Sequence, residues 1–208
     1  MASRVVAQRY DSSHRELLLI NDQRDREAYP LATVSGLRYA LKGIAGKMNL
    51  QRDILFLSLS SHGSDEPELS VSNGVLSLDQ ITGENLVQAL RDSGIRWRII
   101  VISACHAGAF IPALKDPSTI IITAAASDRT SFGCSNDRDL TYFGEAFYRD
   151  ALLNARTLDQ AFALAQQSIA KREASEHITS SQPQASFGAD LERVLFQYPM
   201  KEPVVAQN

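Results

Sequence analysis

Short apolar runs alternate along the chain with longer segments in which apolar residues recur every three or four positions. Four runs have the length and composition of strands, and they cover residues 15–21 (RELLLIN), 53–61 (DILFLSLSS), 97–104 (WRIIVISA) and 118–126 (STIIITAAA). Apolar runs of this length between polar loops are typical of strands buried on both faces of a sheet. Because helical patterns separate them, the sequence predicts an α/β fold, a mostly parallel sheet sandwiched between helices.

The segments between the runs predict helices and one turn. Apolar residues recur at steps of three and four from 34 to 48, which is the buried stripe of an amphipathic helix. Residues 82–91, 141–153 and the segment after Thr157 predict further helices. Residues 68–78 predict a small hairpin with its tight turn at Asn73-Gly74. We expect a single domain over residues 1–198 and a flexible tail over 199–208.

Composition narrows the classes of function. Apolar residues make up 44% of the 208 positions and charged residues 22%, as in ordinary soluble proteins, and the net charge of -3 favours no nucleic-acid partner. No run is long enough to cross a bilayer, and the N-terminus is unlike a signal peptide, so we expect a soluble chain of open compartment. Four histidines and two cysteines predict neither a metal site nor a disulfide framework, and no cofactor is expected.

Two predicted strands end in residues that can carry out covalent chemistry. The second strand ends in SSHG, which places His62 and Gly63 just beyond the sheet, and the third ends in SACHAG, which places Cys105 there. The histidine and the cysteine are 43 positions apart, joined by the hairpin and one helix. A right-handed crossover can make the two strands neighbours, so we expect thiol and imidazole to meet at the carboxyl edge of the sheet.

These residue types suit acyl transfer. A free thiol ionises near pH 8.5, and a neighbouring imidazole can accept its proton and later deliver it to a leaving amine. The backbone N–H groups of Gly63 and Cys105 are candidate donors for the oxyanion of a tetrahedral intermediate. His106 is a rival base by adjacency, but consecutive side chains usually point apart, so we expect it to be a neighbour.

The motifs LFLSLSSHG and IIVISACHAG resemble the His-Gly and Cys motifs of caspase-like cysteine peptidases. The segments TAAASDRTSFGCSND and LTYFGEAFY are similar to legumains, the asparaginyl endopeptidases, and to their bacterial relatives. The same family includes the catalytic subunit of the glycosylphosphatidylinositol transamidase. The resemblance covers roughly residues 15–191 and implies a caspase-like α/β/α sandwich that acts on a peptide or protein substrate.

The resemblance also assigns roles. It implies Cys105 as nucleophile, His62 as general base, and Gly63 as an oxyanion donor together with Cys105. It places Ser131 and Glu145 in the substrate-binding S1 pocket. Legumains carry an acid two residues before the nucleophile, where this chain has Ser103, so the resemblance implies a less charged pocket. The family's first strand, which precedes the RELLLIN segment, has no counterpart here, and we expect an N-terminally shortened fold with His orientation and activity in question.

Several readings of function remain open on these residues. The first is a cysteine endopeptidase that cleaves through a thioester, with Asn or Asp as the family-derived preference before the cut. The second is a transpeptidase or transamidase, in which an amine takes the acyl group. A metacaspase-like enzyme is a third, although Ser103 replaces the acid expected there. A catalytically inactive scaffold of the same fold is the fourth. Monomer and dimer are not distinguished.

Overall fold

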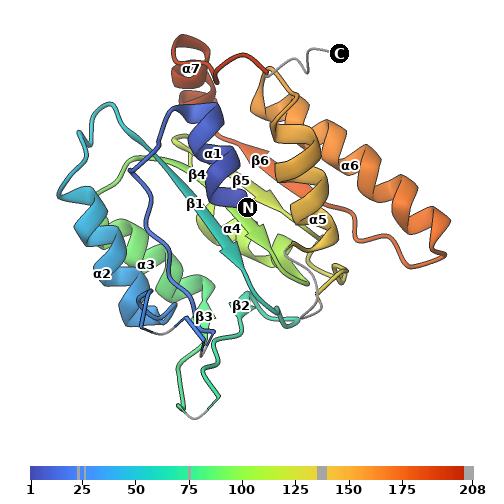
Figure 1. The fold of residues 1–208 in the computed structure, drawn as a ribbon, viewed down its shortest axis with the longest axis horizontal. Helices are drawn as coiled ribbons and strands as arrows, with labels where there is room; N and C mark the ends of the chain where they lie inside the picture. The colour runs from blue at the N-terminus through green and yellow to red at the C-terminus, as the bar shows by residue number, and fades with distance from the viewer. Residues whose placement is uncertain (23, 26, 75, 135–139, 204–208) are drawn as a thin grey trace.

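A four-stranded sheet forms the centre of the computed structural model, which describes residues 1–22, 24–25, 27–74, 76–134 and 140–203 (Figure 1). The strands lie in the order β1-β4-β5-β6. β1 (Ile54–Ser60), β4 (Trp97–Ser103) and β5 (Thr119–Thr123) run parallel, and β6 (Gln184–Phe187) is antiparallel to β5. The predicted strands over 53–61, 97–104 and 118–126 are therefore confirmed.

Helices cover both faces of the sheet. One face carries α2 (Val34–Ala45), α3 (Gly83–Ser93), the 3-10 turn η1 (Ala107–Phe110) and α4 (Ile111–Leu114). The other carries α1 (Ala2–Tyr10), α5 (Tyr142–Gly144), the π-helix η2 (Glu145–Leu152), α6 (Leu158–Ser175) and α7 (Ala189–Gln197). Figure 1 shows α2 and α3 on one side of the strands and α1, α5 and α6 on the other.

The period of two along β4 explains why both faces are apolar. Ile99 and Val101 pack toward α1, η2 and α6, whereas Ile100 and Ile102 pack toward α2 and α3. All four are at most 1% exposed. A strand with both sides buried reads as a continuous apolar run, which is the pattern that predicted this sheet.

Polar side chains fix where several helices begin and end. Thr33, Thr82 and Thr157 precede α2, α3 and α6, and each hydroxyl accepts a hydrogen bond from the backbone N–H three residues later. Gly94 closes α3 in the left-handed conformation, with φ of 69°, as expected for a C-terminal cap.

The first predicted strand is wrong. Residues 15–21 form no strand, and Leu17 and Leu18 are 49% and 37% exposed. Ile20 donates its N–H to the carbonyl of Pro30, but the segment forms no ladder with the sheet. A short apolar run becomes a strand only where a neighbour pairs its backbone, and in the described part of the chain β1 is an edge strand that pairs with β4 alone. Among the described residues no strand precedes β1.

The predicted hairpin is displaced rather than absent. Its ladder joins β2 (Glu68–Leu69), inside the predicted range 68–78, to β3 (Ile81–Thr82), which lies beyond that range. Gly74 has the positive φ expected at the turn, 67°. The Gln80 side chain accepts the N–H of Val71 and donates to its carbonyl, so it takes the place of a strand partner there. Residue 75 lies outside the described residues.

Candidate active site

The carboxyl ends of β1 and β4 bring the two motifs together. Ser60 is the register partner of Ser103, so His62 and Cys105, each two residues further along, lie beyond the same edge of the sheet. The Ser61 N–H donates to the carbonyl of Ser103 at 3.3 Å and continues the pairing past the strands. The structure therefore places the histidine and cysteine motifs side by side, as the crossover argument predicts.

Gly63 lies directly against the backbone of Cys105. A side chain at this position would put its Cβ far inside van der Waals contact with the Cys105 carbonyl oxygen. The same loop is fixed from the other side, because Ser70 donates its N–H to the carbonyl of His62 at 2.9 Å and Gly63 pairs with Leu69. Glycine is required here for close approach of two backbones.

The thiol of Cys105 is half-buried and its hydrogen-bond contacts in the described part of the chain all go to Ser131. The Ser131 N–H points at the sulfur at 3.3 Å, the Ser131 carbonyl lies 3.5 Å from it, and the Ser131 hydroxyl 3.8 Å. A backbone N–H donated to sulfur favours the thiolate, whereas the carbonyl can accept from the protonated thiol. No hydrogen bond joins the sulfur to His62 among the described residues.

Cys134 is the second cysteine of the chain and lies in the same loop as Ser131, between β5 and α5. It is not joined to Cys105 in a disulfide, and both cysteines are free. Partial burial of the thiol raises the pKa of Cys134, and the nearby Cys105 raises that pKa further. A raised pKa keeps the Cys134 thiol protonated and therefore less reactive.

His106 contacts the loops that follow β1 and β5, beside Cys105. Its backbone has a left-handed φ of 55° and its N–H donates to the carbonyl of Arg129 at 2.8 Å. Its ring lies 3.0 Å from the carbonyl of Ser127 through Nδ1 and 3.2 Å from the carboxylate of Asp65 through Nε2. Both ring nitrogens are engaged away from the sulfur, so His106 is a neighbour of Cys105, as the sequence suggested.

The three pocket candidates fall into two groups. Ser131, which is 8% exposed, contacts the sulfur directly. Ser103 joins its hydroxyl to that of Thr141 at 2.8 Å, and Thr141 in turn accepts the N–H of Glu145. Glu145 is thus linked to Ser103 through the start of α5, one turn of helix away.

Sequence reasoning missed the arginines that surround Glu145. Its carboxylate pairs with Arg172 at 2.8 Å and with Arg149 at 3.3 Å. The Arg172 guanidinium also stacks 3.3 Å from the centre of the Tyr142 ring. Arg149 follows Glu145 at helical spacing and could have been noticed, whereas Arg172 comes from α6, with no local signal. The negative charge that was assigned to the pocket is therefore compensated.

The sequence pattern of the Peptidase C13 family matches residues 31–191. The chain belongs to the Peptidase C13 family. This is the legumain family of cysteine peptidases, so the protein is a cysteine-type peptidase whose substrates are peptides or proteins. The matched range contains every candidate residue of the site. A search of curated proteins found no significant match to the sequence.

A solved structure shows the same fold. The crystal structure of caspase-1 from Spodoptera frugiperda superposes with a TM-score of 0.54, at 16% sequence identity, over 77% of this chain and 71% of that chain. At this identity the likeness establishes the caspase-like fold alone. The Peptidase C13 protein described here therefore has the sandwich that the sequence predicted.

Among the described residues, no group of three or more His, Cys, Asp or Glu side chains is placed to hold a metal ion. Within the same residues, none of the helices has both the length and the apolar character that a membrane span requires.

Proposed function

We propose that this Peptidase C13 protein is an endopeptidase in which Cys105 attacks the scissile carbonyl and His62 serves as the general base. The observation that carries the proposal is the register of β1 and β4, which sets the His62-Gly63 backbone against Cys105 at the carboxyl edge of the sheet. Thiol and imidazole at adjacent strand ends are the two parts that acyl transfer through a thioester needs.

The proposed reaction has two stages. The Cys105 thiolate adds to the carbonyl carbon, and the carbonyl oxygen takes the negative charge near the N–H groups of Gly63 and Cys105. The protonated His62 delivers its proton to the leaving amine as the C–N bond breaks, which leaves a thioester. His62 then takes a proton from a water molecule, the hydroxide adds to the thioester, and the acid is released as the thiolate re-forms.

Ser131 has a second proposed role, at the Cys105 sulfur, in addition to its proposed place in the S1 pocket. Its N–H lies 3.3 Å from the sulfur and can donate a hydrogen bond to the sulfur during the reaction. No hydrogen bond joins the sulfur to His62 in the described part of the chain, and catalytic hydrogen bonds often tighten only when substrate is bound.

The proposed substrate preference is Asn, or Asp, immediately before the cut. A carboxamide both donates and accepts hydrogen bonds, and the residues proposed for the pocket offer both. The hydroxyls of Ser103 and Ser131 can donate or accept, and the paired charges of Glu145 and Arg172 offer one acceptor and one donor.

Cleavage of a diverse peptide mixture tests the function. The purified chain should produce new peptide ends, read by mass spectrometry, with Asn or Asp enriched before the cut. Alkylation of the thiols before incubation should abolish the cuts. Products joined to an added amine, in place of free acids, would show transfer rather than hydrolysis. Cuts that persist after alkylation, or a folded chain that makes none, would contradict the proposal.

A further inference from the structure

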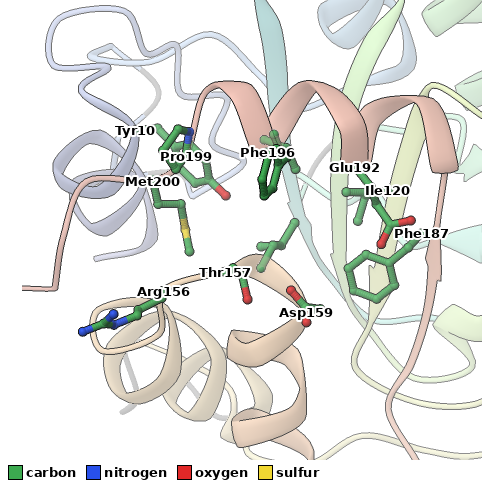
Figure 2. Close-up of a pocket in the computed structure, with 12 residues that line it drawn as sticks. Tyr10, Ile120, Arg156, Thr157, Asp159, Phe187, Glu192, Phe196, Pro199 and Met200 are labelled. Carbon is green, nitrogen blue, oxygen red and sulfur yellow. The ribbon is translucent and has the colours of Figure 1, made fainter.

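A second concave site lies at the opposite end of the sheet from Cys105. A cavity of about 380 Å³ is enclosed by the end of α1, the beginning of β5, the end of β6, the beginning of α6, and α7 with the residues after it (Figure 2). Ile120, at the amino end of β5, forms part of its floor, whereas Cys105 follows the carboxyl end of the parallel strand β4. The cavity is therefore separate from the proposed active site.

The cavity is apolar inside and acidic at its mouth. Its apolar lining includes Ile120, Leu158, Phe187, Leu195 and Met200. Asp159 and Glu192 are exposed beside it, and neither forms an ion pair or a side-chain hydrogen bond in the described part of the chain. Arg156 also lines the cavity, with its side chain directed outward in Figure 2, so two carboxylates and one guanidinium surround it and the balance is negative. An occupant should combine an apolar group with a positive charge.

α7 presents such a combination on the same face of the protein. Phe196 lies at the rim of the cavity and is 90% exposed, which is unusual for so large an apolar side chain. Arg193 precedes it by one helical turn, on the same side of α7, with its side chain 75% exposed. Its ion pair with Asp190 is on the surface and therefore weak. Tyr198, 53% exposed, extends the apolar surface.

We propose that this face joins two copies of the chain across a twofold axis, with the Phe196 ring of each copy seated in the cavity of the other. A twofold interface uses the same patch on both partners, so a protruding group and a matching hole must both lie within it. The aromatic ring of Phe196 fits the apolar lining, and Arg193 of one copy faces Asp159 and Glu192 of the other. An acidic amphiphile such as a fatty acid would instead meet two carboxylates at the mouth.

The proposed dimer does not depend on the proposed catalytic residues or on membership of the family. The family match ends at residue 191, so Phe196 and Arg193 lie outside it. Aromatic residues that fill a pocket at the centre of an interface commonly contribute most of the binding energy, so Phe196 is the residue to change first.

Sedimentation equilibrium of the full chain tests the proposal. Over a series of protein concentrations the wild type should pass from monomer to dimer, and Phe196→Ala should weaken the association at least about tenfold. Tyr39→Ala is the matched control, because Tyr39 is a 77% exposed aromatic on α2, on the opposite face of the sheet. Its association should equal that of the wild type. Because Phe196 is so exposed, its removal should leave the melting temperature unchanged at concentrations where the wild type is monomeric.

Charge reversal gives a second, independent arm. Arg193→Glu should weaken association, and adding Glu192→Arg to it should restore part of the loss, since the pair is rebuilt with opposite signs. A wild type that stays monomeric, or a Phe196→Ala variant that associates as tightly as the wild type, would overturn the proposal. So would a monomer that binds a short peptide containing Phe beside Arg, which would assign the cavity to another protein. The readout is mass, so a failure here leaves the peptidase assignment untouched.

Discussion

Replacing His62 with alanine is expected to lower kcat/KM for peptide cleavage by about 10²- to 10⁴-fold, the usual contribution of a positioned acid–base group. The physical reason is that the thiol then loses the group that accepts its proton and the leaving amine loses the group that protonates it. The variant should remain folded, because the side chain of His62 forms no hydrogen bond with the rest of the described chain. Steady-state kinetics on one cleaved peptide provide the measurement.

Two other histidines serve as controls for this result. His14→Asn changes an exposed histidine outside the site and should leave kcat/KM unchanged. His106→Asn removes the ring that contacts Asp65 and Ser127, and it should reduce activity less than His62→Ala. A larger loss for His106→Asn than for His62→Ala would mean that His106, and not His62, is the general base.

Replacing Gly63 with alanine is expected to lower kcat by about 10²- to 10³-fold, the scale of losing one oxyanion donor. The added Cβ would clash with the carbonyl oxygen of Cys105, which is backbone and cannot swing aside. The loop must therefore move away from the nucleophile and take the Gly63 N–H with it. The measurement is kcat from steady-state cleavage, with circular dichroism to confirm that the fold is kept.

Gly43→Ala is the matched control for that substitution. Gly43 lies within α2, and a Cβ there would meet nothing within 4 Å. Alanine in a helix interior is favoured over glycine by roughly 0.5–1 kcal/mol, so this variant should be slightly more stable and fully active. If Gly63→Ala were as active as Gly43→Ala, the close approach of Gly63 to Cys105 would have no part in catalysis.

The meeting of the histidine and cysteine motifs could be predicted from sequence because it depends on the most regular part of the chain. β1 and β4 are long apolar runs with an abrupt polar end, and parallel neighbours must bring those ends together. The apolar run at residues 15–21 is equally regular, yet the strand predicted there does not form. Whether such a run becomes a strand is decided by a hydrogen-bonding neighbour, and the sequence of the run does not report one.

Other features depend on contacts between distant segments. Arg172 reaches Glu145 from α6, across 27 positions of sequence, so no local pattern could assign it to the pocket. α7 was not among the predicted helices, because four polar residues interrupt its apolar ones and its only fully buried side chain, Leu191, packs against distant segments of the core. β6 was missed because QASF is too short and polar to stand out before β5 pairs with it.

The central claim is that Cys105 is the nucleophile of this peptidase, and covalent trapping tests it most directly. The chain would be incubated at neutral pH with a short peptide that ends in Asn and carries a thiol-reactive electrophile in place of the scissile bond. Mass spectrometry of the digested protein would then locate the adduct. We expect one adduct, on Cys105, that is absent from Cys105→Ala and forms much more slowly in His62→Ala. Labelling of Cys134 at the same rate as Cys105, or labelling of neither, would contradict it.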